Sequence, residues 1–423
     1  MKRNLVLILT LLSFISVFAD EPFRIHRYDA FKAAAVQSDQ IVMIGNSITN
    51  MHEWWEALGN HKVINRGVSG AISDEAVANL DPILAGHPAK AFLLIGTNDF
   101  VFDKDREHIA ENLQIIIDRF KKESPETKVY VQSILPSYNG KRRGKIAAAN
   151  ELIRTVCRKS GITYIDLYSV LGDGEGHIKE GWSFDDLHPK APGYVAWINA
   201  ILPYLNEGSN DKSFCNYPMQ LPDIYEGRMN SWGARLGTLS LMPIEAEDIV
   251  FIGDEMIHSG EWHELLESAH AKNRGTGWGY PGCDINWLEK EIPNFMHGNP
   301  KSVCPATVVL YAGAQEVENK LDIKEFEAKY RSLLDLVHQE APTAKVQLLS
   351  IAPNDDDEKD EQFTQPYNAF LKKIAKKDKM ATFVDIYTPL KADDMMEDNY
   401  VMAKGYQVIA NLVKQTATQQ IKK

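Results

Sequence analysis

The chain has 423 residues, of which 44% are hydrophobic and 25% are charged. This composition is typical of soluble globular proteins, and the length predicts two or three domains. The formal net charge of −12 argues against nucleic acid or an anionic membrane surface as a partner, because both bind basic protein surfaces.

Residues 1–19 have the pattern of a cleavable signal peptide. A short basic start precedes an apolar run from Leu5 to Phe18, and Ala19 places a small residue at the cleavage point. The run is short for a membrane span, with an N-terminal anchor helix as the alternative. We therefore expect a periplasmic or secreted protein with no integral membrane segment.

Short β-branched apolar runs then alternate with amphipathic helical stretches. This alternation predicts buried parallel strands joined by helices, packed as an α/β/α sandwich. In the first half of the chain the predicted strands are Gln40–Ile44, Lys62–Asn65, Lys90–Ile95, Lys128–Ile134 and Thr163–Asp166.

The second half of the chain repeats the first in the same order. "IVMIGNSITN" at Ile41–Asn50 returns as "IVFIGDEMIH" at Ile249–His258, and "AFLLIGTND" at Ala91–Asp99 returns as "VVLYAGAQE" at Val308–Glu316. Such a repeat predicts two α/β domains of the flavodoxin-like, three-layer α/β/α type with parallel sheets. The predicted organisation is a signal peptide (1–19), a first domain (20–206), a linker (207–220) and a second domain (221–423).

Residues suited to catalysis follow the strands of the first domain. Ser47 lies at the turn after the first strand, Gly70 follows the second and Asn98 the third. Asp185 and His188 lie three residues apart, where an aspartate can orient an imidazole. A helix cap or a turn would explain each residue alone, but the carboxyl ends of parallel strands converge at one edge of a sheet.

In this order the residues resemble the marker segments of the SGNH (GDSL-like) hydrolases, a family of serine esterases. The segments are "IGNSIT", "GVSG", "GTND" and "DDLHP". The resemblance implies Ser47 as nucleophile, His188 as base and Asp185, rather than the adjacent Asp186, as the residue that holds His188. It also implies an oxyanion hole made by Ser47, Gly70 and Asn98, and a two-step acyl transfer that needs no metal or organic cofactor.

The departures from the family pattern are mild. "GNSI" stands for the commoner "GDSL", and Ala71 stands where many relatives have aspartate. Neither change touches a predicted catalytic group.

The corresponding positions of the second domain have lost these groups. Glu255 stands for Ser47 and Gln315 for Asn98. The histidine and aspartate are replaced by Tyr400 and Glu397, and the glycine corresponds to Gly277 or Gly279. The second domain is therefore predicted to be a degenerate, non-catalytic copy.

Several roles for the second domain stay open at this point. Glu255 paired with Glu316 or Glu397 would offer acid–base chemistry, and the domain could pack on the first as an intramolecular mimic of a homodimer. We expect the histidines His258, His263 and His270 to be solvated residues rather than a metal site. A sugar-binding surface would use the aromatic residues Trp262, Trp278, Tyr280 and Trp287.

Among SGNH enzymes the first domain looks similar to bacterial sialate O-acetylesterases and platelet-activating-factor acetylhydrolase-like acetylesterases. The resemblance implies removal of O-acetyl groups from carbohydrate, with sialic acid first. Acetyl esters of other polysaccharides and short-chain lipid or aryl esters are alternatives, as are acyl transfer to a sugar and a glycan-binding protein with a vestigial site.

Residues near the motif loops are candidates for binding the substrate. Arg142 or Arg143 would clamp a sialic acid carboxylate. The predicted pocket neighbours are Trp54, Trp55, Tyr138, Trp182 and Phe184. Of the four cysteines, Cys157 is predicted to be in the core, and one bridge is open among Cys215, Cys283 and Cys304.

Overall fold

A computed structural model describes residues 22–207, 231–276 and 283–421. The chain divides into two compact units, here called the N-terminal unit (Met1–Leu58 and Lys62–Pro222) and the C-terminal unit (Asp223–Lys423, to which Gly59–His61 are also assigned). The sequence features that lie outside the described residues are the predicted signal peptide, nearly all of the predicted linker, Cys215, Gly277, Trp278, Gly279 and Tyr280.

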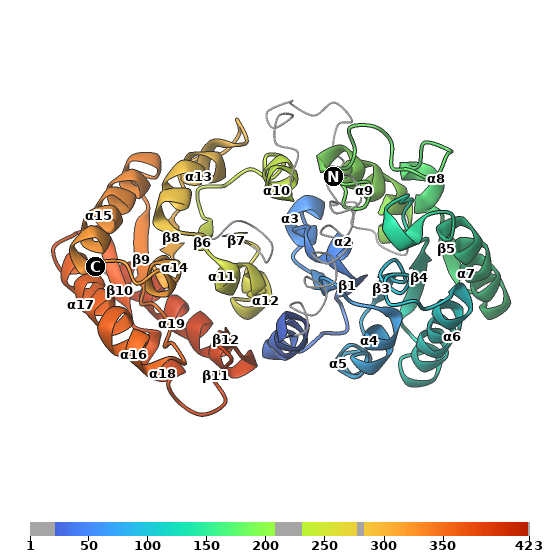
Figure 1. The fold of residues 1–423 in the computed structure, drawn as a ribbon, viewed down its shortest axis with the longest axis horizontal. Coiled ribbons are helices and arrows are strands. Elements are labelled where there is room, and N and C mark those ends of the chain that lie inside the picture. The colour runs from blue at the N-terminus through green and yellow to red at the C-terminus, as the bar shows by residue number, and fades with distance from the viewer. Residues whose placement is uncertain (1–21, 208–230, 277–282, 422–423) are drawn as a thin grey trace, which may run out of the picture. The chain divides into compact units, whose positions relative to one another are not determined.

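The N-terminal unit is built on a five-stranded parallel sheet with strand order β2-β1-β3-β4-β5 (Figure 1). The strands lie within two residues of their predicted bounds: β1 (Ile41–Gly45), β2 (Val63–Gly67), β3 (Lys90–Leu94), β4 (Lys128–Gln132) and β5 (Thr163–Ile165). The helices are α2 (Ser47–Asn50), α3 (Trp54–Leu58), α4 (Ser73–Ala78), α5 (Asp81–Ala85), α6 (Arg106–Glu123), α7 (Ile146–Ser160), α8 (Leu167–Leu171) and α9 (Ala191–Leu205).

Both faces of this sheet are covered, as the unbroken apolar strands require. On one face, alternate strand residues such as Val42, Leu93 and Val131 share a core cluster with residues of α4, α6 and α7. On the other face the indole of Trp197 in α9 donates to Gln132 Oε1 at 2.6 Å. The sheet is therefore the central layer of a three-layer sandwich.

The C-terminal unit repeats this plan with strand order β10-β9-β8-β6-β7, again all parallel. Its strands are β6 (Ile249–Gly253), β7 (Ala271–Gly275), β8 (Thr307–Leu310), β9 (Lys345–Leu349) and β10 (Ala381–Val384), with a hairpin of β11 (Met396–Glu397) and β12 (Tyr400–Val401). Its helices are α10 (Ser231–Leu239), α11 (Glu255–Ser259), α12 (Trp262–Leu265), α13 (Ile285–His297), α14 (Ala314–Glu318), α15 (Ile323–Glu340), α16 (Asp357–Lys359), α17 (Gln365–Ala375), α18 (Tyr387–Leu390) and α19 (Ala403–Ile421). The predicted fold class, two tandem α/β units with parallel sheets, is confirmed.

The two units share local contacts as well as topology. In the N-terminal unit the Trp54 indole donates to the carbonyl of Thr49, and in the C-terminal unit the Trp262 indole donates to that of Ile257. Strand register is also shared, since Gly45 pairs with Gly67 and Gly253 with Gly275.

The second glycine of each pair lies directly against a helix backbone. A Cβ on Gly67 would be 2.4 Å from the backbone nitrogen of Asn50, and one on Gly275 would be 2.2 Å from that of His258. Only a residue without a side chain lets the helix after the first strand pack this closely on the second strand.

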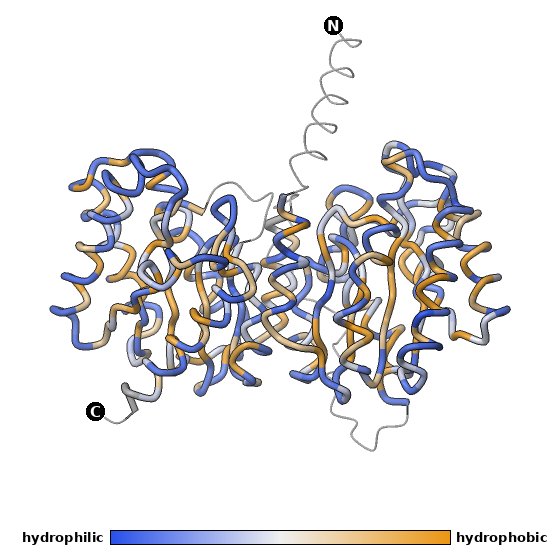
Figure 2. The backbone as a smooth tube through the Cα atoms, turned by 90° about the horizontal axis from the view of Figure 1, so that it is seen from below, coloured by the Kyte–Doolittle hydropathy of each residue, from blue (hydrophilic) through white to orange (hydrophobic). Residues whose placement is uncertain are grey.

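The strands are hydrophobic along most of their length, whereas the helices alternate hydrophobic and hydrophilic residues (Figure 2). None of the described helices combines the length and apolar character that a membrane span requires.

Candidate active site

Ser47 lies at the first residue of α2, directly after β1 and Asn46. The Asn46 side chain accepts the backbone N–H of Ile48 at 3.1 Å and so caps the short helix. This turn brings the hydroxyl of Ser47, itself a mostly buried residue, to the carboxyl edge of the sheet.

The imidazole of His188 joins Ser47 to Asp185. Ser47 Oγ lies 2.8 Å from His188 Nε2, and His188 Nδ1 lies 2.7 Å from Asp185 Oδ2. Burial by itself would raise the pKa of Asp185, but the hydrogen bonds and charge of His188 outweigh it and lower that pKa. Because an ionised carboxylate only accepts, Nδ1 carries the hydrogen and Nε2 presents its lone pair to the serine hydroxyl.

The loop that carries His188 is fixed by its own hydrogen bonds. Asp185 Oδ1 accepts the backbone N–H of His188 at 2.8 Å, and Ser183 Oγ donates to the His188 carbonyl at 2.8 Å. The ring of Phe184 stacks on the imidazole with centroids 5.7 Å apart. These contacts hold the His188 loop and the His188 imidazole in a fixed orientation.

Asn98 and the Gly70 loop are connected on the other side of the site. Asn98 Nδ2 donates to the carbonyl of Ala71 at 3.0 Å, and Ser69 Oγ donates to Asn50 Oδ1 of α2 at 2.9 Å. Gly70 has a φ of 83°, a left-handed conformation that favours glycine. These bonds tie the loop after β2 both to the serine helix and to Asn98.

Arg142 occupies a position that the sequence did not indicate. Its side chain is buried, and its guanidinium donates through Nη2 to Asn98 Oδ1 and through Nε to the Thr97 carbonyl, both at 3.1 Å. The expectation that Arg142 clamps a substrate carboxylate is corrected, because these bonds commit the guanidinium to the "GTND" loop. The 3₁₀ turn Gly140–Arg142 directs the side chain inward.

Arg143, by contrast, is exposed. Its guanidinium lies over the ring of Tyr138, 4.5 Å from the centroid, and Tyr138 is half-buried. Trp182 is also half-buried, under the ammonium of Lys179. These residues have accessible surface, as substrate-binding residues require.

Trp54 and Trp55 were predicted as pocket neighbours, and the structure corrects that prediction. Both side chains are buried in the fold. Trp54 packs edge-on against Trp197, with centroids 4.9 Å apart, and also contacts Tyr194. The hydrophobic driving force for burying an indole places them in the core.

Asp186 has a structural position distinct from that of its neighbour Asp185. Its carboxylate accepts the backbone N–H groups of Tyr138 and Ile178, at 2.8 and 2.9 Å, and lies 2.9 Å from His177 Nδ1. Its φ of 58° turns the chain so that two successive aspartates face different partners. Asp186 thereby joins its own loop to the loop that carries Tyr138 and to the loop that carries His177 and Ile178.

The C-terminal counterparts form no similar chain of hydrogen bonds among the described residues. Gln315 of α14 donates to Oδ1 of Asn319, the C-cap of that helix, at 3.5 Å, and Glu397 is exposed. Glu316 is buried and accepts the backbone N–H of Ile285 at 2.7 Å. The carboxylate pairs left open by the sequence are thus engaged elsewhere or exposed, while Trp262 is buried against Phe251.

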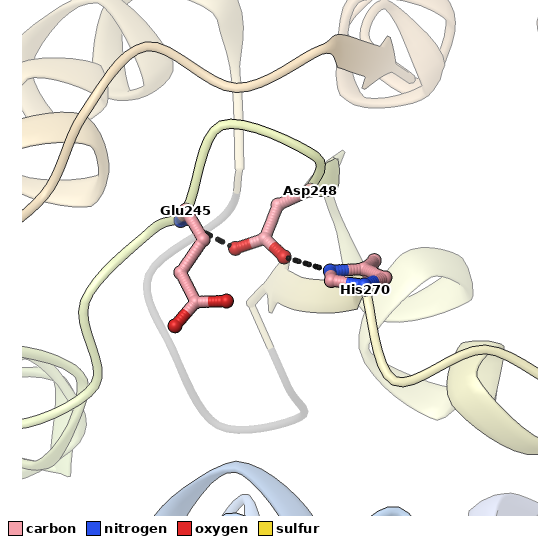
Figure 3. Close-up of side chains that lie close together, drawn as sticks. All are labelled: Glu245, Asp248 and His270. Carbon is pink, nitrogen blue, oxygen red and sulfur yellow. Dashed lines mark hydrogen bonds and ion pairs between the residues drawn. The ribbon is translucent and has the colours of Figure 1, made fainter.

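Two groups in the C-terminal unit bring possible metal ligands together, and one of them is shown in Figure 3. Its central residue Asp248 is fully buried and lies 3.2 Å from His270 Nδ1, while its other oxygen accepts the backbone N–H of Glu245 at 2.7 Å. Lys272 Nζ lies 3.9 Å from the same carboxylate and already supplies a positive charge. The other group is Glu261, His263 and Glu264. His263 and His270 therefore belong to separate clusters, and the one in Figure 3 is an ion-paired brace. The expectation that the histidines are solvated is wrong for His258 and His263, which are buried.

Three of the four cysteines lie in the described residues. Cys157 is fully buried, as predicted, and Cys157, Cys283 and Cys304 are free.

Comparisons with known proteins match parts of the chain. Residues 43–196 match the model of the GDSL-like lipase/acylhydrolase family. The chain is 26% identical over 171 residues to the N-acylneuraminate cytidylyltransferase of Escherichia coli, a match that covers 38% of this chain and 39% of that protein. The chain thus spans about two fifths of the curated relative's length.

Solved structures match just under half of the chain. A Streptococcus pneumoniae protein whose structure is named for platelet activating factor is 27% identical, with a TM-score of 0.42, over 47% of this chain and 98% of its own. A GDSL-like lipase of Bacteroides thetaiotaomicron is 20% identical, with a TM-score of 0.37, over 44% of this chain and 98% of its own.

Proposed function

We propose that the N-terminal unit, whose residues 43–196 match the GDSL-like lipase/acylhydrolase family, is a carboxylic ester hydrolase that works through a Ser-His-Asp acyl-enzyme mechanism. The observation that carries this proposal is the continuous chain from Ser47 Oγ to His188 Nε2 and from His188 Nδ1 to Asp185, at 2.8 and 2.7 Å. Nucleophile and base lie within hydrogen-bond reach, and a third group orients the base.

In the first step Ser47 Oγ attacks the ester carbonyl while His188 Nε2 takes the serine proton. The tetrahedral intermediate collapses, the C–O bond to the alcohol breaks, and His188 returns the proton to the leaving oxygen. Water then attacks the acyl-serine with His188 again as base, which releases the acid and restores Ser47. Asp185, whose pKa is lowered by His188, stays ionised and stabilises the imidazolium that forms in each step.

The oxyanion of each intermediate needs donors placed in advance. We assign this role to the backbone N–H groups of Ser47 and Gly70 and to the side-chain amide of Asn98. Arg142 fixes which end of the Asn98 amide faces the site, because a guanidinium can only donate and so selects Oδ1 as its partner. One Nδ2 hydrogen is engaged by the Ala71 carbonyl, and the other is left for the oxyanion.

For the substrate we propose an O-acetylated carbohydrate, with sialic acid first. The curated relative is named for N-acylneuraminate, which is a sialic acid. Arg143 is the remaining candidate for its carboxylate, because it is exposed and already held over the Tyr138 ring. Acetyl esters of other polysaccharides, and short-chain lipid or aryl esters, are the alternative substrates.

Acetate release from O-acetylated sialoglycan by the mature protein tests the proposal. The Ser47→Ala variant should release none, whereas Glu255→Gln, the matched change in the C-terminal unit, should release as much as the unmodified protein. If 4-nitrophenyl acetate were cleaved in a Ser47-dependent way but sialoglycan were not, the mechanism would stand and the sialic acid assignment would fall. Activity in Ser47→Ala would reject the mechanism itself.

We also propose that the protein is exported, on the pattern of residues 1–19. Cell fractionation and N-terminal sequencing of the mature protein would test this. A mature chain that begins at Met1 in the cytoplasmic fraction would reject it.

A further inference from the structure

The C-terminal unit has a cavity of about 930 Å³ at the carboxyl edge of its sheet. Its lining includes Asp254 after β6, Tyr311 after β8 and Ile351 after β9, together with Tyr400 of the β11–β12 hairpin. Open parallel sheets bind ligands at this edge, and the volume lies within the range of small-molecule sites. The position is that of the candidate active site in the N-terminal unit, although the reactive groups are different.

The charge of the lining is strongly one-sided. Among the described lining residues the only basic one is Lys359, and its Nζ lies 2.6 Å from Glu318 Oε2, so its charge is already paired. A lining of this sign repels anions and concentrates cations. We call this cavity the acidic cleft. Six carboxylates line it: Asp254, Glu255, Glu318, Asp355, Asp356 and Asp398.

Two of these carboxylates lie where the first unit has Asn46 and Ser47. Asp254 caps α11 by accepting the Met256 N–H at 2.9 Å, and Glu255 is the next residue. Burial raises the pKa of Asp254 to about 7. A carboxylate whose ionised form is disfavoured by burial is stabilised by a cation that binds beside it.

Thr364 provides an observation that does not depend on charge. It lines the acidic cleft and is completely buried, and its hydroxyl has no hydrogen-bond partner among the described residues. It ends the π-helix Asp360–Thr364, a rare element that often marks functional sites. Buried hydroxyls are normally paired, so a ligand with hydroxyl groups would satisfy this one.

The cleft is better suited to an organic cation than to a metal ion. Within the described parts of the chain, the two groups with closely spaced metal-ligating atoms are those of Glu245 and of Glu261, and neither lies in the cleft. The lining instead offers the side-chain amides of Gln315, Asn354 and Asn399 and the rings of tyrosines. Amides bind hydroxyl groups, and tyrosine faces attract ammonium groups.

We propose that the acidic cleft binds a small organic cation that carries several hydroxyl groups, such as an amino sugar. The C-terminal unit would then be a binding module that kept the sheet edge of an esterase and exchanged its reactive groups for carboxylates. This proposal does not depend on the reaction at Ser47.

Calorimetric titration of the full chain with four probes tests the proposal. Glucosamine should bind at least about tenfold more tightly than N-acetylglucosamine, which has the same ring without the charge, and glucuronic acid should not bind. Equal affinities for the three sugars, or no binding of glucosamine at millimolar concentration, would overturn the proposal. Putrescine, a diamine without hydroxyls, should bind more weakly than glucosamine, and the opposite order would also overturn it.

Charge-neutralising variants locate the binding. The double variant Glu255→Gln/Asp398→Asn should weaken glucosamine binding by about tenfold or more, and its side chains keep the original size. Asn is also well tolerated at the positive φ of Asp398. Asp335→Asn, an exposed change on α15 outside the cleft, is the matched control and should bind normally. Unchanged affinity in the double variant would place the site elsewhere and refute the proposal.

Thr364→Val separates binding from folding. Because the hydroxyl has no hydrogen-bond partner to lose within the described part of the chain, the variant should keep or raise the melting temperature while its affinity for glucosamine falls several-fold. A variant that binds as tightly as the unmodified chain would remove Thr364 from the site and contradict the argument that depends on it.

Discussion

The two units keep the same internal braces but differ at the sheet edge. In each, an asparagine on the second strand binds loop carbonyls after the first strand: Asn65 donates to His52, and Asn273 to Gly260, both at 3.2 Å. A tyrosine of the last helix also donates to the helix after the first strand, Tyr194 to Ile48 and Tyr406 to Met256. None of these bonds uses a predicted catalytic residue. The scaffold therefore does not depend on the chemistry at its edge.

The difference extends from side chains to backbone. Gly96 and Gly313 have the same φ of 115° after the third strand of each sheet. Beyond them the N-terminal unit forms turns in which Arg142 holds Asn98, whereas the C-terminal unit begins α14 at Ala314. Exchanging side chains alone would therefore not rebuild an oxyanion hole in the C-terminal unit.

The largest expected contrast lies between His188 and its counterpart Tyr400. His188→Ala should lower kcat/KM for 4-nitrophenyl acetate on the order of 10⁴-fold, because it removes the base that Ser47 needs. Tyr400→Ala should leave the rate unchanged. Steady-state kinetics on both variants measure the contrast, and a His188→Ala enzyme with a tenth of the normal rate would contradict the assignment.

Asn98 and Gln315 form the second contrast. Asn98→Ala should lower kcat on the order of 10²–10³-fold, the usual cost of losing one oxyanion donor, while the protein stays folded. Gln315→Ala should have no effect on hydrolysis. Near-normal turnover by a folded Asn98→Ala enzyme would remove Asn98 from the oxyanion hole.

Arg142 should have a smaller effect, exerted through Asn98. Arg142→Met keeps the buried stem but removes the guanidinium, so kcat should fall about tenfold with little change in KM. Since the two residues act together, Arg142→Met/Asn98→Ala should be no slower than Asn98→Ala alone. Arg143→Met is the control and should raise KM only for a sialylated ester. Additive losses in the double variant would show that Arg142 acts independently of Asn98.

The smallest effect concerns stability of the C-terminal unit. Burial holds the pKa of Asp254 near 7, above the ordinary value of about 4 in an unfolded chain. The folded state therefore binds the proton more tightly, and stability falls as pH rises from about 4 to 7. Asp254→Asn keeps the cap without the charge. It should be nearly neutral at pH 4 and stabilising by about 1–2 kcal/mol at pH 8.

Urea denaturation of the unmodified chain and of Asp254→Asn at both pH values measures this difference. The transition to follow is that of the C-terminal unit. A stability difference that did not grow with pH would show that the carboxyl of Asp254 ionises in the folded protein as it does in the unfolded chain.

The sequence predicted the sheets well because their signal is local. Apolar runs such as Ile41–Ile44 and the turn at Gly45 repeat in the second half of the chain. Each predicted strand was therefore supported by two copies of its sequence. The spacing of Asp185 and His188 was equally informative. Their motif fits within one loop, and the structure joins the two side chains at 2.7 Å.

The contacts of the loop after β4 could not be predicted. Nothing in "NGKRRGK" distinguishes the buried Arg142 from the exposed Arg143, because a loop has no period that fixes which side chain points inward. Trp54 and Trp55 were misassigned for a related reason. Closeness to Ser47 in sequence does not show which way a side chain of α3 points. The Trp54 indole packs on Trp197 of α9, more than a hundred residues later, and Trp55 is buried as well.

The close packing at Gly67 has a practical consequence for random mutagenesis. Any side chain there would displace the helix that carries Ser47, since even a Cβ would come within 2.4 Å of the Asn50 backbone. A screen for lost esterase activity should therefore recover Gly67 variants together with Ser47 variants. A count of inactive clones alone would wrongly suggest that Gly67 takes part in the reaction. An assay of soluble, folded protein for each clone would distinguish Gly67 variants, which disturb the packing, from Ser47 variants, which lose the nucleophile.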